Sequence, residues 1–571
     1  MVDVNIDGEN ISVEEGTTIL EAAKKLGINI PTLCYLKEFG PTSCCRICLV
    51  DIVNGKGLAP ACSFAVAQGM IISTNSEKVK NARKLNLELL LSNHNYDCIH
   101  CSKDKKCELQ KLVIEYDADE NKFKGEKTPS KIDSSGYSIE RDNSKCILCK
   151  RCVLACNKRQ TVHAIGLSKR GFNTHIASPF DLPLNTSPCV NCGQCILACP
   201  TGALKEISNV DLVKKILKDK KKIKVAAIAP SVRVTMGEEF GLGYGSNIEP
   251  QIVTGLKKLG FDLVFDVDFS ADLTIVEEAN EFVSRVVNGG KLPMFTSCCP
   301  GWIEFVKKYY PEFTDNLSSC KSPQQMFGAI LKSYYAEKTG IDPKDIIMVS
   351  VMPCTAKKSE INLFDMDSSG YKDIDVSITV RELGKIARDS GIDFTKLNGS
   401  NFDRLMGDST GAGVIFGASG GVMEAALRTA TDIITGEDLK EINYKTIRGM
   451  KGIKEAKLNI AGKTVKIAVA SGLSNARKLL DAIKANKAYY DFIEIMACPG
   501  GCINGGGTPF VESDDQNFVD YKLARASYLY SDDQNKQIRK SHKNPEIIEL
   551  YKWLGKPNGK KAHKYLHRHY K

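Results

Sequence analysis

Short apolar runs alternate with turns over the first 75 residues. The runs VDVNI, NISV, ICLVDIV and MIIST have the length and composition of strands, and one helix is predicted near Thr18–Leu26. The pattern therefore predicts a small sheet with one helix. A helical stretch, Val79–Leu91, follows it.

The pattern changes near Asp211 to strands that alternate with helices. The apolar runs are KVAAIAP, PMFTSCC, IIMVSVMPC, VKIAVASG and FIEIMACPGG, and helical patterns lie between them, for example at Thr274–Val287 and Pro323–Thr339. This alternation predicts an α/β domain.

Three of these strands end in cysteine, at Cys298–Cys299, Cys354 and Cys498. Ligands of α/β sheets bind at the carboxyl ends of strands, so we expect these thiols and Cys502 to meet at one metal centre. The glycines around Cys498 and Cys502 either let backbone approach a cofactor or form tight turns. The glycine-rich segment 411–421 fits a dinucleotide fingerprint poorly, and no nucleotide site is predicted.

The composition is that of a globular protein, with 571 residues, 43% hydrophobic and 26% charged. This length suggests about three to five domains. No apolar run approaches the length of a membrane span, and no signal peptide is visible, so we expect a cytoplasmic protein. Of the 22 cysteines, sixteen lie between Cys34 and Cys199. Because cytosolic thiols are kept reduced, dense cysteines there indicate metal rather than disulfides.

The net charge is +10, with basic segments at Lys214–Lys224 and Lys556–Lys571. These segments are either solvated surfaces or a means of attracting an acidic electron carrier. No nucleic-acid-binding motif accompanies the charge, so nucleic acid is not an expected partner.

The first cysteine group is Cys34, Cys45, Cys48 and Cys62. A close CxxC pair with outlying cysteines on both sides is the plant-type arrangement for a 2Fe-2S cluster. Cys44 offers a competing register, but the CxxC spacing favours Cys45.

The second group combines one histidine with three cysteines: His94, Cys98, Cys101 and Cys107. Spacing alone leaves zinc and a 4Fe-4S cluster as equal alternatives. The cluster motifs on both sides favour the 4Fe-4S cluster.

Two copies of the bacterial ferredoxin motif follow. In two-cluster ferredoxins the fourth cysteine of each run binds the other cluster. One predicted 4Fe-4S set is Cys146, Cys149, Cys152 and Cys199, and the other is Cys189, Cys192, Cys195 and Cys156. Four clusters in series indicate transport of single electrons.

The segments TSCCPGW (296–302), MPCTAKK (352–358) and MACPGGC (496–502) resemble the three signatures of iron-only (FeFe) hydrogenases. The resemblance covers nearly the whole chain, and the order of the N-terminal clusters matches the large monomeric clostridial type. It implies an α/β catalytic domain of mixed sheets flanked by helices, in two lobes around the active site. N-terminal α+β ferredoxin-like domains precede it. The expected domains are 1–78, 79–125, 126–209 and 210–571, the last with a small-subunit-like segment at about 510–571.

The resemblance also implies an active centre made of a 4Fe-4S cube joined to a two-iron unit with CO, cyanide and azadithiolate ligands. The expected cube ligands are Cys299, Cys354, Cys498 and Cys502. Residues expected to contact the two-iron unit are Lys357, Ser231, Met352 and Met496. Ala356 stands where some relatives have serine.

A proton path is implied in the same way, with Cys298 as proton donor and acceptor, followed by Glu278, Ser318, Glu281 and Arg285. The two glutamates and Arg285 are spaced i, i+3 and i+7, so they share one helix face. A solvated, ion-paired stripe is the alternative. Thiols and carboxylates suit proton transfer because burial moves their pKa values toward neutrality.

The expected function is reversible reduction of protons to H2, with electrons from an acidic low-potential carrier such as ferredoxin or flavodoxin, after action of maturation enzymes. Three alternatives remain: a cluster-bearing subunit of an NADH or formate dehydrogenase, a non-catalytic iron-sulfur assembly relative, and a hydrogen-sensing or electron-bifurcating hydrogenase subunit.

Overall fold

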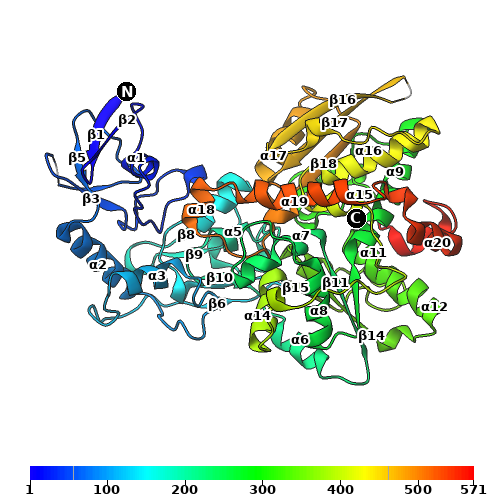
Figure 1. Ribbon diagram of the computed structural model, residues 1–571, viewed down its shortest axis with the longest axis horizontal. Helices are drawn as coiled ribbons and strands as arrows, with labels where there is room; N and C mark the ends of the chain where they lie inside the picture. The colour runs from blue at the N-terminus through cyan, green and yellow to red at the C-terminus, as the bar shows by residue number, and fades with distance from the viewer. Residues whose placement is uncertain (56, 461, 571) are drawn as a thin grey trace.

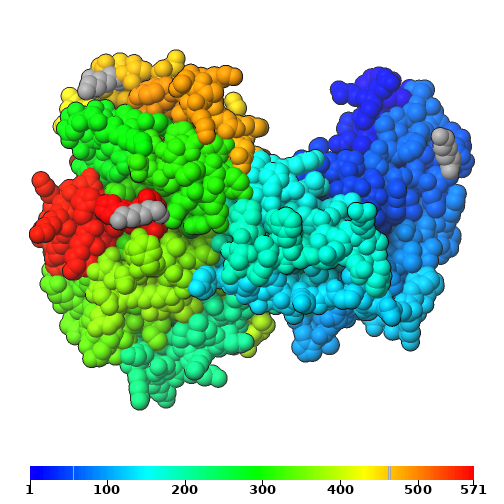
Figure 2. All heavy atoms as spheres, turned by 180° about the vertical axis from the view of Figure 1, so that it is seen from behind, coloured from blue at the N-terminus to red at the C-terminus, as the bar shows by residue number. Residues whose placement is uncertain are grey.

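The computed structural model describes residues 1–55, 57–460 and 462–570. The N-terminal domains lie on one side of the molecule and the α/β part on the other (Figure 1). Seen from behind, the segment coloured cyan lies between the blue N-terminal part and the green-to-red remainder (Figure 2). Lys571, the last residue of the basic tail, is outside the described residues.

The first domain is a five-stranded sheet in the order β2-β1-β5-β3-β4 with one helix, as the pattern predicted. Its strands are β1 Val2–Ile6, β2 Glu9–Val13, β3 Leu49–Ile52, β4 Gly57–Pro60 and β5 Ile71–Ser73. Helix α1, Ile19–Lys25, begins at a capping box in which Thr18 and Glu21 satisfy each other's backbone donors.

Two short segments connect this domain to the rest of the chain. Helices α2, Glu77–Leu91, and α3, Glu108–Glu115, form the first. The second contains strands β6 Ile132–Asp133, β7 Ile139–Asp142, β8 Gly166–Ser168, β9 His175–Ala177 and β10 Leu204–Glu206, with helices α4 Arg151–Leu154 and α5 Gln194–Ala198.

Arg151 holds several of these parts together. Its side chain is fully buried, forms an ion pair with Glu108 at 3.1 Å and donates to Ser513 Oγ at 2.7 Å and to Leu33 O at 3.3 Å. A buried guanidinium with a paired charge and several acceptors favours one relative placement of the segments it joins.

The α/β part contains two four-stranded sheets. In the order β12-β11-β14-β15 all strands are parallel, and in the order β13-β18-β17-β16 only β16 is antiparallel. The strands are β11 Ile223–Ile228, β12 Leu263–Asp266, β13 Met294–Phe295, β14 Ile346–Met352, β15 Val376–Thr379, β16 Ile453–Ile460, β17 Lys463–Ser471 and β18 Phe492–Met496. The predicted mixed sheets and two lobes are therefore present.

Helices cover both sheets. The principal ones are α6 Val210–Leu217, α8 Glu249–Leu259, α9 Val267–Asn288, α10 Pro300–Tyr309, α11 Pro323–Ile330, α14 Val380–Asp389, α16 Gly421–Thr435 and α17 Leu473–Lys484. Short helices are α7 Pro230–Arg233, α12 Ala336–Thr339, α13 Ala356–Glu360 and α15 Gly411–Val414. Helix α9 packs against both α11 and α16. The single helix expected over 323–339 has a π-helical stretch at Leu331–Tyr335.

The last sixty residues wrap around the α/β part. Their helices are α18 Ser513–Phe518, α19 Tyr521–Asn535, α20 Pro545–Leu554 and α21 Lys560–Leu566. Helix α19 crosses the molecule between the two lobes (Figure 1). After α21 the chain pairs with the segment near Cys320, since Cys320 and His567 form an antiparallel bridge. No helix among the described residues is long and apolar enough to cross a membrane.

Candidate functional site

The cysteines that follow β13, β14 and β18 converge, as expected from the ends of parallel strands. Burial, and then the charge of Cys299, raises the pKa of Cys354 to about 12. Burial also raises the pKa of Cys502, and Cys299 and Cys354 raise it further. The pKa of Cys498 is raised by burial and then by the charges of Cys354 and other thiols. Thiolates here would lose hydration and repel one another. A bound cationic centre would offset both effects, so the site favours a metal.

The glycine-rich loop lies directly against this cluster of thiols. A Cβ on Gly505 would come 2.1 Å from Pro353 O, and one on Gly507 would come 2.9 Å from Cys354 N. Contacts below 3.0 Å are not tolerated, so only glycine fits at these positions. The glycines thus let two cysteine-bearing loops approach each other by their backbones.

Three further predicted residues lie around the thiols. Lys357 donates from Nζ to Cys298 O at 3.1 Å and pairs with Glu360 at 2.9 Å. Burial lowers its pKa, but the Glu360 carboxylate outweighs this effect, so the net pKa is raised and the side chain stays charged. Met352 and Met496 are both buried.

Ser231 has a buried hydroxyl with no hydrogen-bond partner among the described residues. A Cβ on Gly417 would come 2.8 Å from this oxygen. Buried polar atoms are nearly always paired, so an orphaned hydroxyl in a close-packed site indicates a missing polar ligand.

A chain of titratable groups leads outward from Cys298. Burial, and then Glu278, raises the pKa of the Cys298 thiol. Burial and the charge of Glu281 raise the pKa of Glu278 to about 8, although Ser318 and the Ser297 backbone lower it in part. Ser318 Oγ donates to Glu281 Oε2 at 3.0 Å.

Arg285 ends the predicted chain. Its guanidinium donates to Glu281 at 2.6 Å and to Leu317 O at 2.7 Å. All three charged members lie on α9, as their spacing predicted. Glu278 is fully buried, so the alternative of a solvated stripe does not describe it.

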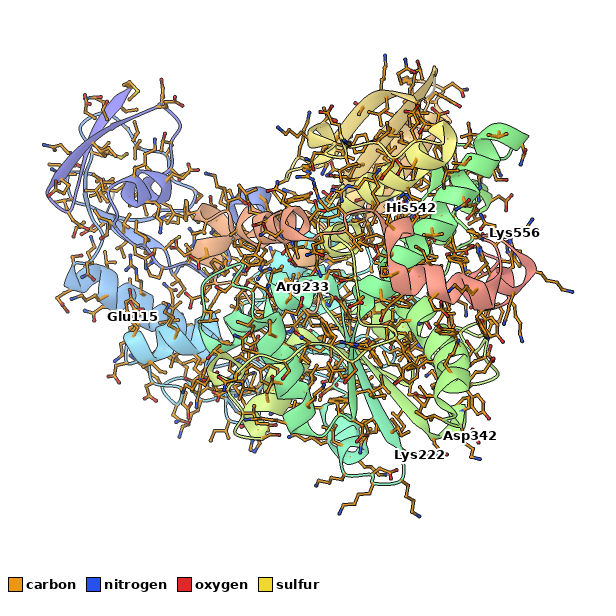
Figure 3. All side chains as sticks on the ribbon, turned by 45° about the vertical axis from the view of Figure 1, so that its right-hand side comes forward. Glu115, Lys222, Arg233, Asp342, His542 and Lys556 are labelled. Atoms are coloured by element: carbon orange, nitrogen blue, oxygen red, sulfur yellow. The ribbon has the colours of Figure 1, made fainter. Side chains whose placement is uncertain are left out.

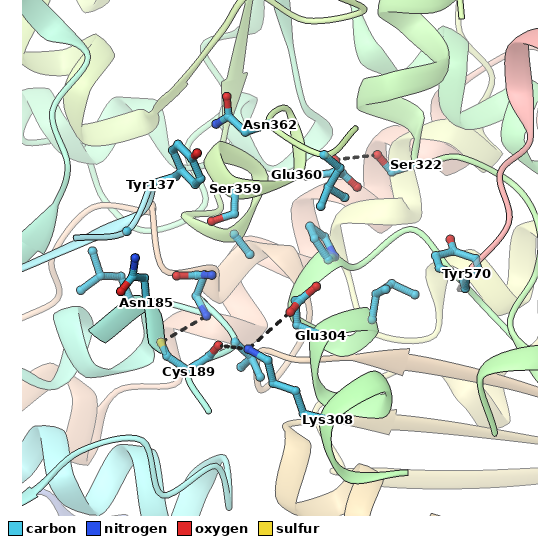
Figure 4. A pocket seen from close by; sticks show the side chains of 18 of the residues that line it. Tyr137, Asn185, Cys189, Glu304, Lys308, Ser322, Ser359, Glu360, Asn362 and Tyr570 are labelled. Atoms are coloured by element: carbon cyan, nitrogen blue, oxygen red, sulfur yellow. Dashed lines mark hydrogen bonds and ion pairs between the residues drawn. The ribbon is translucent and has the colours of Figure 1, made fainter. Parts of the chain in front are cut away.

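A cavity of about 360 Å³ lies beside this site rather than at the strand-end thiols (Figure 4). It is lined by residues of the 126–209 segment, the 297–308 and 356–363 segments, and the C-terminal tail. Lys308 reaches across it, donating to Cys189 O at 2.6 Å and pairing with Glu304 at 3.4 Å. Glu360 and Ser322 line this cavity, and Glu360 accepts from both Ser322 and Lys357, which in turn donates to Cys298 O.

The N-terminal cysteines gather into the predicted groups. Cys34, Cys45, Cys48 and Cys62 are all buried, whereas Cys44 is exposed. Hydrogen bonds from both Cys44 and Cys45 lower the pKa of Cys34, so proximity does not separate the two registers. Exposure favours Cys45, because cluster ligands are shielded from solvent.

His94, Cys98, Cys101 and Cys107 line one small cavity. Burial, followed by Lys127 and Lys145, lowers the pKa of His94 to about 4. Its Nδ1 has no hydrogen-bond partner among the described residues. A neutral imidazole with a free nitrogen is the form that binds metal.

The ferredoxin-type cysteines meet in crossed sets. Cys146, Cys149, Cys152 and Cys199 line a second small cavity. Burial and the charges of Cys192, Cys189 and Cys156 raise the pKa of Cys195. The fourth cysteine of each run therefore faces the other set, as the motif predicted.

The second of these sets lies next to the strand-end thiols. After burial and Cys354, the charge of Cys192 is the next largest cause of the raised pKa of Cys498. Thr355 Oγ1 donates to Asn191 O at 2.7 Å. A Cβ on Gly193 would come 2.4 Å from that Thr355 oxygen.

Two glutamines, which the sequence did not single out, complete this junction. Gln160 Nε2 donates to Ala497 O at 2.8 Å, and Gln194 Nε2 donates to Asn504 O at 2.8 Å. Neither residue carries a sequence signal, because each contact joins segments more than 300 residues apart.

These features define an iron-sulfur redox protein in which a series of cysteine sets ends at a four-cysteine site. The family model described as iron only hydrogenase large subunit, C-terminal domain, matches residues 222–506, and iron hydrogenase small subunit matches 519–571. Three iron-sulfur models match the N-terminal part: 2Fe-2S iron-sulfur cluster binding domain at 1–77, NADH-ubiquinone oxidoreductase-G iron-sulfur binding region at 83–122, and 4Fe-4S dicluster domain at 145–203.

Two relatives align with the full length of the chain. The chain is 45% identical to Iron hydrogenase 1 of Clostridium pasteurianum, with 100% of both chains covered. It is also 45% identical to NADP-reducing hydrogenase subunit HndD of Solidesulfovibrio fructosivorans, covering 100% of this chain and 99% of the relative. An apo FeFe-hydrogenase HydA1 from Chlamydomonas reinhardtii superposes with a TM-score of 0.56 at 42% identity, covering 64% of this chain and 99% of that one. The chain belongs to the iron-only hydrogenase family, and hydrogenase activity is thereby supported.

Proposed function

We propose that this protein reduces protons to H2 and oxidises H2 with a low-potential carrier as its electron partner. One observation carries the proposal: a set of buried and half-buried strand-end thiols lies where a cysteine-lined path meets a chain of titratable groups. Electron delivery and proton delivery are the two supplies that this reaction requires.

The residues present fit the expected cofactor. Cys299, Cys354, Cys498 and Cys502 would hold the 4Fe-4S cube, and the orphaned hydroxyl of Ser231 would donate to a ligand of the two-iron unit. Lys357 would place its ammonium group at a second ligand, while Met352 and Met496 would enclose the unit and exclude water. When bound, the cofactor supplies electrons and an open iron coordination site.

Cys298 and Glu278 would move protons at this site. With a pKa near 8, Glu278 is mostly protonated at pH 7, so it can give a proton to the Cys298 thiolate and be refilled through Ser318 from Glu281. The Lys357 ammonium near Cys298 lowers the cost of the thiolate form. Every proton that reaches Cys298 from Ser318 and Glu281 would therefore pass through Glu278.

Electrons would enter through the N-terminal domains. We propose one 2Fe-2S cluster on Cys34, Cys45, Cys48 and Cys62, and 4Fe-4S clusters on His94 with its three cysteines and on the two crossed sets. The net charge of +10 suits an acidic carrier such as ferredoxin or flavodoxin. The proposed domains remain 1–78, 79–125, 126–209 and 210–571.

A second candidate follows from one relative. The name of the Solidesulfovibrio protein says that it is a subunit of an NADP-reducing hydrogenase, and its similarity covers the full chain. This chain would then pass electrons to a nucleotide-binding partner subunit.

The test uses protein matured with the hydrogenase maturation enzymes. We expect H2 release from reduced ferredoxin and H2 uptake with an artificial acceptor, measured by gas chromatography. Absence of both activities in iron-replete, matured protein would refute the proposal. Reduction of NADP⁺ by H2 only after addition of partner subunits, with little ferredoxin activity, would favour the second candidate.

A further inference from the structure

A second chain of hydrogen-bonded side chains begins at Glu281. Ser319 Oγ donates to Glu281 Oε2 at 3.1 Å, and the same hydroxyl lies 2.8 Å from Nδ1 of His567. The other ring nitrogen, Nε2, lies 2.9 Å from Oε2 of Glu277. An unbroken chain of hydrogen bonds therefore joins Glu281 to Glu277 through an imidazole.

The C-terminal tail brings His567 to this place. The backbone of Arg568 donates to Ser319 O at 2.8 Å, next to the bridge between Cys320 and His567. His567 is only 8% exposed. His563, one turn earlier in α21, is exposed, and its ring centroid lies 4.2 Å from that of His567. The buried imidazole is thus one ring away from solvent.

Arg285 is poorly suited to carry protons itself. A guanidinium does not give up its protons under ordinary conditions, so Arg285 can orient Glu281 but cannot release one proton and take another. An imidazole accepts a proton at one nitrogen and releases one from the other near neutral pH. His567 is hydrogen-bonded at both nitrogens, as this transfer requires.

A bound cation is the other use for these groups. Glu281, Cys320 and His567 each offer one atom, all within 4.8 Å of one another. The guanidinium of Arg285 already neutralises Glu281, and Ser319 and Glu277 already engage both ring nitrogens of His567. The arrangement therefore favours proton transfer over a metal site.

We propose that Ser319 and His567 form a second proton branch, which joins the relay at Glu281 in parallel with the route past Arg285. The inference rests on the hydrogenase function proposed above. For inward transfer, the Ser319 hydroxyl gives its proton to Glu281 as it receives one from Nδ1 of His567. The ring takes a proton at Nε2 from Glu277, and Glu277 takes one from the hydroxyl of half-exposed Tyr551, which solvent refills, so each proton count is unchanged and no electron moves.

Titratable and charged groups from several elements surround His567. The titratable and charged side chains of the surrounding elements are Glu277, Glu278, Glu281 and Arg285 on α9, Cys320, Asp365, Tyr551 on α20, and His563, Arg568, His569 and Tyr570 in the tail.

The variants Ser319→Ala and His567→Gln, in matured protein, test the branch. Each should lower H2 evolution by about threefold to tenfold, less than loss of a sole proton donor because the other route remains. Added imidazole should restore part of the loss in H567Q. Arg285 orients Glu281 for the other route, so combining H567Q with Arg285→Gln should reduce turnover by more than the product of the single effects, as expected for parallel routes. His542→Gln, which removes a histidine that contacts Thr429 and Asp432 rather than Glu277 or Ser319 (Figure 3), is the matched control.

A readout without turnover is the titration of His567 in protein that lacks the two-iron unit. With only 8 histidines in the chain, selective ¹⁵N labelling resolves the ring signals, and H567Q identifies the relevant one. Its midpoint should move in S319A and in Glu281→Gln.

Wild-type turnover in S319A, H567Q and the R285Q double variant, together with an unmoved midpoint, would overturn the branch. Absence of hydrogen activity in the matured wild type would instead refute the proposed function.

Discussion

The substitution Glu278→Gln tests whether the proton of this carboxyl, rather than its size, is needed for H2 turnover. The wild-type pKa near 8 means that about nine in ten molecules carry the proton at pH 7. Glutamine keeps the size and neutrality of the protonated form but cannot release a proton. We therefore expect H2 turnover to fall by about 10² to 10⁴, the usual contribution of a positioned acid. In the wild type, turnover should decline as the pH rises through 8.

Stability should also fall as the pH rises. The ordinary pKa of 4.5 rises to about 8 on folding, so this carboxyl stabilises the fold below pH 4.5 and the contribution is lost as the pH rises through 8. At about 1.4 kcal/mol per pH unit, the full difference is roughly 5 kcal/mol, of which about 3 kcal/mol falls between pH 6 and 9.

Glu278→Gln should remove this pH dependence in denaturant unfolding followed by the fluorescence of buried Trp302. Glu312→Gln, at a surface pair with Lys484, is the control and should change neither property. Turnover within about threefold of wild type, with the same pH profile, would refute the proposed role of Glu278.

Three further predictions concern separate parts of the molecule. Cys298→Ala should reduce H2 evolution about 100-fold while the infrared bands of the cofactor persist; unchanged turnover would remove Cys298 from the path. Gly193→Ala would place a Cβ 2.4 Å from Thr355, at a φ of +68°, and should destabilise the junction by about 1–3 kcal/mol and slow electron delivery from ferredoxin, seen in stopped-flow reoxidation. Normal reoxidation would show that the junction tolerates displacement. Arg428→Met leaves Asp533 and Glu424 without a buried partner. It should lower the free energy of unfolding by about 3–5 kcal/mol, measured with denaturant. A smaller decrease would mean that Arg448 compensates.

Local patterns in the sequence were enough to predict the cysteine sets and the strands that carry the site. The spacing of the two ferredoxin runs predicts which thiols face each other, and the strand before Cys354 ends at Met352, where its apolar run stops. Fold class followed for the same reason, since strand and helix periods are local properties of the chain.

Contacts between distant segments could not be predicted. His567 meets Glu277 across 290 residues, and only the return of the C-terminal tail to Cys320 brings them together. The π-helical stretch at Leu331–Tyr335 was missed because its apolar positions fit a continuous helix. The CxxC spacing already favoured Cys45 over Cys44, and the structure adds that Cys45 is buried whereas Cys44 is exposed, which spacing does not reveal.

The infrared spectrum of the matured, iron-replete protein tests the central claim most directly. The account predicts stretching bands of CO and cyanide that change when H2 is admitted, with about 20 irons per chain from one two-iron cluster, three four-iron clusters and a six-iron active centre. About 14 irons, no such bands and no H2 uptake would contradict it.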